Sequence, residues 1–211
     1  MDKLSELETL ATETHSDNLA RILELTNDVN EEVRMRAFEL LIDYESNTIC
    51  RIQVRKGLHD VDELVRATCA EILGDWKDQE SLETLVTMAL KDRSHIVSMY
   101  AIVAIGDLGN RTIIPRLKHL VTQVNRRKSF FFYYALYRLD GSLIYLQKFL
   151  NGLQNEDYHL RCAVANLCIE IVNDSNQDFL LIAVQEALKK EKTVAARSSM
   201  QTFLAKIPQI L

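Results

Sequence analysis

Carboxylate side chains recur along this sequence at a step of 32 residues, and two of the recurring aspartates follow a glutamate by four positions, one helical turn. Carboxylates held close together can perform general acid/base chemistry. They can also form a ridge of negative charge that attracts a basic partner and raises its encounter rate. The members of this set are Glu39, Asp43, Glu71, Asp75, Asp107 and, in a later copy, Glu170.

Five consecutive aromatic residues at 130–134 follow a short basic run at 126–128. Successive residues of a helix are turned by about 100°, so five adjacent rings cannot all face one core. Aromatic and arginine side chains dominate the strongest contacts of protein interfaces. Alternatively, a wide groove between repeats buries the rings, and the sequence leaves the two possibilities open. If residue 132 is buried, the opposite face carries Arg127, Phe131, Tyr134 and Arg138.

Motifs of known catalytic and cofactor sites are absent from the sequence. It contains no GxSxG elbow, no phosphate-binding glycine loop, no HExxH and no dinucleotide fingerprint. The five histidines are scattered without the spacing of metal ligands. We therefore predict a protein that is not an enzyme and that uses no cofactor and no metal. Four cysteines, none in a CxxC pair, are expected to be reduced, buried thiols: Cys50, Cys69, Cys162 and Cys168.

The elements that position these side chains are predicted to be helices arranged in pairs. Apolar residues recur at i, i+4, i+7, i+8 and i+11 counted from Val33, Val65 and Val97, again at steps of 32 residues. A shorter amphipathic segment precedes each of these helices, so one period is a helical hairpin. Strand-like alternation is not sustained anywhere in the sequence.

The repeating motifs resemble those of a known family. VRATCAEILGDW at residues 65–76 and AIVAIGDLGN at 101–110 are similar to HEAT-like repeats, including the short variety of the bilin lyase type. The resemblance covers nearly the whole chain and is weakest at 125–141. It implies an all-α fold, an α-solenoid of about six hairpins behind a short N-terminal capping helix. It also offers a structural explanation for Asp75 and Asp107, which follow glycines of the repeat motif.

The repeat pattern predicts a single HEAT-like domain over residues 1–211. Stacked hairpins bury a continuous core that no hairpin could form alone. If the family geometry holds, the second helices line an inner, concave face, where such proteins usually bind. We expect the N-terminal cap helix within residues 1–15 and hairpins at approximately 16–46, 47–78, 79–110, 111–141, 142–174 and 175–211.

A turn residue followed by an arginine six positions later is a further repeating feature. The turn carboxylate or amide can bond the arginine of its own or of the neighbouring repeat, which would create a ladder along the stack. Asp92 is followed at this distance by Ser98, and Asn125 has no matching arginine, which predicts a bend or a looser joint in the fourth repeat. The residues assigned to the ladder are Asp28, Arg34, Asp60, Arg66, Asp92, Asn155 and Arg161.

The charge is distributed unevenly, which concerns partners rather than fold. Residues 1–110 hold 11 Lys+Arg and 22 Asp+Glu, a net of −11, whereas residues 111–211 hold 14 and 8, a net of +6. The sequence shows neither a secretion signal nor a run of about 20 apolar residues, so we expect a cytoplasmic protein without a membrane partner. We predict a non-catalytic scaffold or inhibitor that grips a basic protein on its concave face. The most concrete hypothesis is a bacterial immunity-type protein that neutralises a basic, nuclease-like toxin domain.

Two other functions remain as alternatives. The resemblance allows a bilin lyase or chaperone-like HEAT subunit. The basic and aromatic segment at 126–134 would suit a DNA-binding, glycosylase-like HEAT protein, because cations beside rings contact phosphates and stack on bases. However, the net charge of −11 in the first half would repel a duplex, and basic residues do not repeat along the second helices. Nucleic acid is therefore not the expected partner.

Overall fold

The computed structural model describes residues 2–12 and 18–210, with side chains described as far as residue 207. These residues form α-helices joined by turns and short 3-10 helices, and none of them lies in a β-strand. The all-α repeat fold expected from the sequence is confirmed. The chain divides into two compact units, unit 1 (Met1–Ile113) and unit 2 (Ile114–Leu211). The single domain over 1–211 and its six hairpin boundaries stay predictions.

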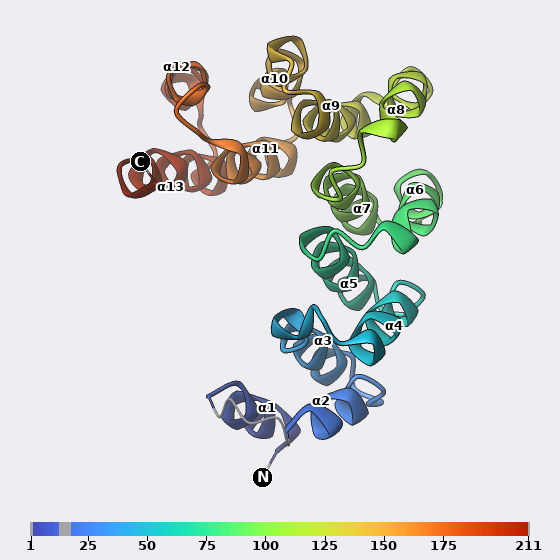
Figure 1. Ribbon diagram of the computed structural model, residues 1–211. Coiled ribbons are helices and arrows are strands. Elements are labelled where there is room, and N and C mark those ends of the chain that lie inside the picture. The colour runs from blue at the N-terminus through green and yellow to red at the C-terminus, as the bar shows by residue number, and fades with distance from the viewer. Residues whose placement is uncertain (1, 13–17, 211) are drawn as a thin grey trace. The chain divides into compact units, whose positions relative to one another are not determined.

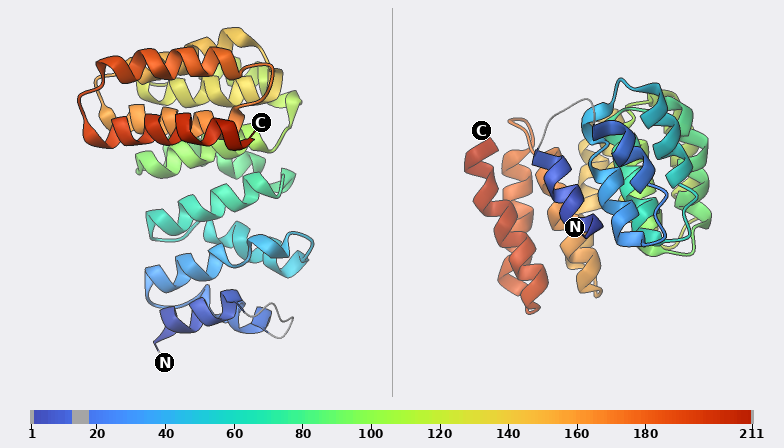
Figure 2. Two further views of the ribbon diagram at one scale, coloured as in Figure 1. Left: turned by 90° about the vertical axis from the view of Figure 1, so that its left-hand side faces the viewer. Right: turned by 90° about the horizontal axis from the view of Figure 1, so that it is seen from below.

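Unit 1 consists of two layers of helices. Helices α1, α3, α5 and α7 form one layer, and α2, α4 and α6 form the other, each packed on the helix that follows it (Figure 1). Figure 2 shows the α1–α3–α5–α7 layer as a stack running from blue to green. The bounds in unit 1 are α1 (Lys3–Thr12), α2 (Leu19–Leu25), α3 (Glu31–Glu39), η2 (Ile42–Tyr44), α4 (Thr48–Gly57), α5 (Glu63–Asp75), η3 (Gln79–Ser81), α6 (Leu82–Lys91), α7 (His95–Asp107) and η4 (Arg111–Ile113).

The predicted N-terminal cap helix corresponds to α1, although residues 13–15 of that prediction lie outside the described residues. Helix α1 packs against α3 and buries Leu7. Exposed and half-buried ion pairs attach it to the first hairpin, with Lys3 bound to Asp28 and Glu6 bound to Arg21.

Unit 2 contains longer helices. Helices α8 and α10 pack on α9, and α11 and α12 pack on α13. The 3-10 helix η5 packs against α10 and α11, and a β-carbon at its Gly152 would lie 2.8 Å from the Val164 Cγ2 of α11, too close without a shift. The bounds in unit 2 are α8 (Ile114–Leu120), α9 (Arg126–Asp140), α10 (Leu143–Leu150), η5 (Asn151–Gln154), α11 (Tyr158–Ile171), α12 (Gln177–Lys190) and α13 (Val194–Ile210).

Local sequence sets where the helices of the first layer begin. The side chain of Asn30 accepts hydrogen bonds from the amides of Glu32 and Val33, and Asp62 does the same at the start of α5. Ser94 accepts from the Val97 amide at the start of α7. These side chains satisfy N–H groups that have no partner inside the helix. Because the caps recur every 32 residues, the three helices start in the same register.

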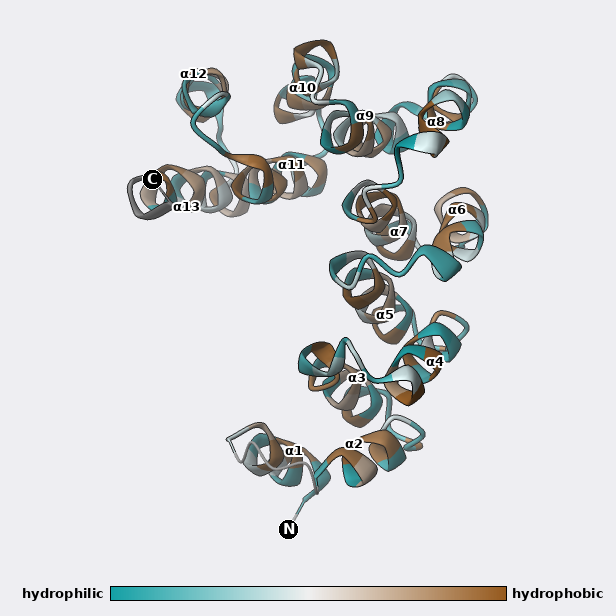
Figure 3. Ribbon diagram, in the orientation of Figure 1, coloured by the Kyte–Doolittle hydropathy of each residue, from teal (hydrophilic) through white to brown (hydrophobic). Residues whose placement is uncertain are grey.

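The apolar stripe of these helices is buried at the predicted interval. Counted along the chain from the starting valine, the side chains at i, i+4 and i+8 are at most 3 % exposed. Figure 3 shows that the helices of unit 1 carry both hydrophobic and hydrophilic residues, as amphipathic helices should. Close packing of α5 on α7 also depends on Gly74, where a β-carbon would lie 2.9 Å from the Ala104 Cα. The buried positions are Val33, Ala37, Leu41, Val65, Cys69, Leu73, Val97, Ala101 and Ile105.

The cysteines serve as packing residues. Cys50, Cys69 and Cys168 are buried free thiols, and Cys162 is half-buried and free. Burial raises the pKa of the three buried thiols, strongly for Cys69 and Cys168. Because the thiolate is the reactive form, these groups are poor nucleophiles.

Candidate functional site

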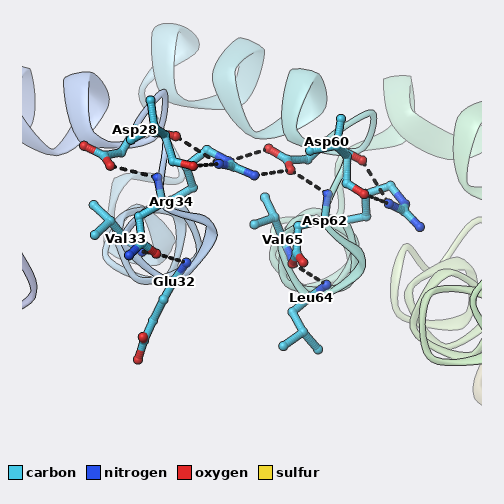
Figure 4. A network of polar contacts seen from close by, with 12 residues as sticks. Asp28, Glu32, Val33, Arg34, Asp60, Asp62, Leu64 and Val65 are labelled. Carbon is cyan, nitrogen blue, oxygen red and sulfur yellow. Dashed lines mark hydrogen bonds and ion pairs between the residues drawn. The ribbon is translucent and has the colours of Figure 1, made fainter.

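An arginine ladder ties each turn of unit 1 to the next one. Arg34 donates from Nε and Nη2 to the two carboxylate oxygens of Asp60 at 2.8 and 2.7 Å. Its Nη1 donates to the main-chain oxygens of Asp28 and Val29 at 2.9 and 3.2 Å (Figure 4). Each arginine therefore serves both its own turn and the neighbouring one, the two possibilities that the spacing left open.

The second rung has the same geometry. Arg66 donates to both carboxylate oxygens of Asp92 at 2.9 Å, and its Nη1 donates to the main-chain oxygens of Asp60 and Val61. Burial disfavours the charged form of Asp92, but the hydrogen bonds from Arg66 and the Ser94 amide outweigh this effect and lower its pKa. Ser98 instead donates from its hydroxyl to the main-chain oxygen of Met88 at 3.5 Å. The ladder thus holds the turns of unit 1 in fixed register.

Unit 2 contains a ladder pair that the sequence analysis found only in part. Arg161 donates to the main-chain oxygens of Asn155 and Glu156, rather than to the Asn155 side chain, and to both carboxylate oxygens of Glu191. Glu191 stands six residues before Arg197, the ladder spacing, so the interval alone could have revealed it. The hydrogen bonds that Glu191 accepts from Arg161 lower its pKa, burial acts in the opposite direction, and hydrogen bonds from Thr193 add to the lowering. The resulting pKa of Glu191 is about 2.

Of the two possibilities that the sequence left open for the aromatic run, burial holds for Phe131 and Tyr134 of α9, which therefore do not form an exposed face with the arginines. Phe131 is 3 % exposed and Tyr134 is 1 % exposed. Tyr134 meets Phe149 edge-on, with ring centroids 5.4 Å apart. The repeat itself does not predict the burial of Phe131, because the corresponding positions, six residues after the capping residue, are not buried where they hold Arg36, Thr68 and Tyr100. Neither ring is therefore exposed to stack on the bases of a nucleic acid.

The two arginines of that predicted face are accessible. Arg127 is half-buried and pairs with Asp157, while Arg138 is exposed and donates to the main-chain oxygen of Glu170 at 3.3 Å. Glu170 is itself exposed on α11. These residues belong to unit 2, whereas the other carboxylates of the predicted ridge belong to unit 1.

The α3–α5–α7 layer of unit 1 is strongly acidic. Apart from the buried ladder arginines, α3, η2, α5 and α7 carry eight carboxylates and a single Lys or Arg, which is Arg36. Six of the carboxylates are exposed, and Glu39 and Asp107 are half-buried. We call this set the acidic surface, and it includes all five unit 1 members of the predicted ridge. Its carboxylates are Glu31, Glu32, Glu39, Asp43, Glu63, Glu71, Asp75 and Asp107.

The other layer of unit 1 has the opposite charge balance. Helices α2, α4 and α6 hold five Lys or Arg residues and two glutamates. Two of these cations, Arg51 and Arg55, are bound to Asp78, whose side chain is 2 % exposed. Negative potential in unit 1 is thus concentrated on one layer, as expected for a surface that attracts a basic partner.

Apolar side chains lie within the acidic layer. Leu64 and Ile96 occupy the same position of α5 and α7 and are 47 % and 42 % exposed. Figure 4 shows Leu64 and its counterpart Glu32 pointing away from the ladder. Tyr100 of α7 is half-buried, and burial together with the nearby Glu71 charge raises its pKa. Apolar and aromatic groups beside charged ones are typical of protein interfaces.

Further features of the described residues concern metal ligands, membrane helices and a pocket. Within residues 2–12 and 18–210, no group of three or more His, Cys, Asp or Glu side chains is arranged to hold a metal ion. No helix of this described part is long and apolar enough to cross a membrane. A pocket of about 380 Å³ in unit 2 is lined by Arg161 and Glu191, but these two groups bond each other.

Comparison with known proteins agrees with this architecture. Residues 53–129 match the family of HEAT repeats. No curated protein matches the sequence significantly. A solved structure of the complex of CpcE and CpcF of phycocyanin lyase from Nostoc sp. PCC7120 is similar, with a TM-score of 0.61 and 19 % identity, over 90 % of this chain and 83 % of that chain. The resemblance to HEAT-like repeats is confirmed, and at this identity the structural likeness concerns the fold alone.

Proposed function

We propose that this protein is a non-catalytic HEAT-repeat scaffold that binds a partner protein with a basic surface. The observation that carries the proposal is the acidic surface, eight carboxylates against one arginine outside the buried ladder, on adjacent helices of one layer. Leu64 and Ile96 add exposed apolar area to the same layer. Apolar groups supply affinity and the surrounding charges supply orientation and a faster encounter.

The ladder contributes to binding by fixing the surface in advance. Each rung uses a bidentate arginine and carboxylate pair, the most directional ion pair available to side chains. The rungs keep the turns before α3, α5 and α7 in register, so the carboxylates need no reordering when a partner arrives. A surface fixed in this way loses less entropy on binding.

The finer form of the proposal is an inhibitor, in particular an immunity-type protein that holds a basic, nuclease-like toxin domain. Such a domain carries cations to bind phosphates, and those cations would meet the acidic surface. Coverage of this cationic surface would keep the nucleic acid out.

The test is co-purification followed by kinetics with the captured partner. We expect a basic protein that associates with wild type and dissociates at high ionic strength, because exposed charges are screened beyond about 8 Å at physiological salt. Glu71→Lys should lower its association rate roughly tenfold at low salt. Glu83→Lys, which makes the same charge change at an exposed site on α6, should leave the rate nearly unchanged. Equal rates for the two variants would contradict the proposal.

A second candidate is a subunit that handles a linear tetrapyrrole, supported by the likeness to the CpcE and CpcF complex of phycocyanin lyase. A change in the visible absorbance of a linear tetrapyrrole on mixing with the protein would favour it. An unchanged spectrum would remove this candidate and leave the protein-binding proposal untouched.

A further inference from the structure

A groove of about 330 Å³ lies between α1 and α3 of unit 1. This volume is at the lower end of the range for binding pockets, about 300 to 1,000 Å³, and suits one or two side chains rather than a large ligand. Helix α1 provides most of its apolar lining, and α3 provides most of its charged rim. The lining residues are Leu4, Leu7, Glu8, Ala11, Glu32, Arg36, Glu39 and Leu40.

The rim of the groove has an excess of negative charge. Arg36 donates to Glu39 at 2.7 Å, and the charges of Glu32 and Glu8 also act on its guanidinium. Three carboxylates therefore surround one cation. Glu32 and Glu39 also belong to the acidic surface, so the groove continues that surface toward α1.

We infer that this groove receives an apolar side chain from a basic segment of the partner protein. The inference rests on the proposed function and names the feature of the partner that the surface recognises. An apolar group would displace water from the lining formed by Leu4, Ala11 and Leu40, while flanking lysines or arginines would contact Glu8 and Glu32. An apolar anchor in a pocket with a charged rim is the arrangement that concentrates binding energy in protein interfaces.

The probe is a fluorescent hexapeptide, Arg-Lys-Leu-Phe-Lys-Arg, titrated against the whole protein by fluorescence anisotropy. Ala11→Trp places a large ring in the groove from an exposed position of α1 and should weaken binding at least tenfold. Thr9→Trp, an exposed substitution on the same helix outside the groove, should leave the affinity unchanged. A peptide with two serines in place of Leu-Phe should bind at least tenfold more weakly.

A charge variant protects the test against a folding defect in α1. Glu8→Gln removes one rim carboxylate at an exposed site and should weaken binding several-fold, whereas Glu24→Gln on α2 should not. Helical circular dichroism equal to wild type would show that the variants are folded.

The outcomes separate this inference from the proposed function. Absence of peptide binding, or equal binding by the Ala11→Trp and Thr9→Trp proteins, overturns the groove. A captured partner whose association depends on Glu71 but not on Ala11→Trp overturns only the groove. If the captured partner associates with the Glu71→Lys protein as fast as with wild type, the proposal that the acidic surface binds the partner is wrong.

Discussion

The two units occupy one repeating position in different ways. In unit 1, the position four residues after the capping residue holds Arg34 in α3 and Arg66 in α5, and each binds a carboxylate 26 residues further along. In unit 2, Asn125 caps α9, and the same position holds Ser129, whose hydroxyl donates to the main-chain oxygen of Arg126 at 2.7 Å. Arg127, two residues earlier, pairs instead with Asp157, 30 residues further along.

This difference shows what the repeat tolerates at that position. Arg34 and Arg66 are 9 % and 7 % exposed, and each makes four hydrogen bonds to turn groups. Ser129 carries no charge, is half-buried and bonds within its own helix. The position therefore accepts a fully paired charge or a small uncharged side chain, whereas an unpaired buried charge would be costly.

The largest expected effect in unit 2 is at Phe131, the buried ring two residues after Ser129. Phe131→Ala should lower the free energy of unfolding by about 3 to 5 kcal/mol, because it removes a buried ring and leaves a cavity. Phe179→Ala, on the 39 % exposed ring of α12, should change it by less than about 0.5 kcal/mol. Urea denaturation followed by circular dichroism measures both. A cost at Phe131 as small as that at Phe179 would mean that the ring is not a core residue.

The ion pairs should sharpen the same comparison with a slightly smaller effect. Arg66→Ala should cost about 3 kcal/mol, because it leaves the Asp92 carboxylate, 11 % exposed, without its partner. Arg127→Ala should cost less than about 1 kcal/mol, because Arg127 and Asp157 are 39 % and 30 % exposed and water replaces the contact. Equal losses in urea denaturation would show that the ladder of unit 1 has no special role.

Much of the fold follows from local sequence. The 32-residue period, the apolar stripe and the turn residues identify the helices of unit 1, because each of these signals depends on neighbours along one chain segment. The same period places the recurring carboxylates on the second helices, and the structure puts Glu71 and Asp75 in one acidic layer. Their role in binding a partner stays a prediction.

Other features depend on contacts between hairpins and carry little local signal. Asp78 binds Arg51 and Arg55, which precede it by 27 and 23 residues and do not recur in other copies. The burial of Phe131 has no local signal, because the corresponding residues Arg36 and Tyr100 are not buried and the run of five aromatics gives no indication of which rings are enclosed. Glu191 was missed because a glutamate replaces the aspartate of the other turns.

The smallest expected effect concerns Glu191, whose ion pair with Arg161 should make stability depend on pH in the acidic range. Glu191 has an ordinary pKa of 4.5 and a folded pKa of about 2, so the unfolded chain takes up its proton first as the pH falls. Its contribution to stability is present above pH 4.5 and is lost as the pH falls toward 2.

Glu191→Gln should therefore reduce the slope of unfolding free energy against pH in this acidic range, and Glu186→Gln, an exposed change on α12, should preserve it. Urea denaturation between neutral pH and pH 3 measures the slope. The lowered pKa of Asp60 and Asp92 in unit 1 leaves part of the slope in both variants. A slope unaltered by Glu191→Gln would mean that the pair with Arg161 does not persist in solution, and that only unit 1 keeps a charged ladder.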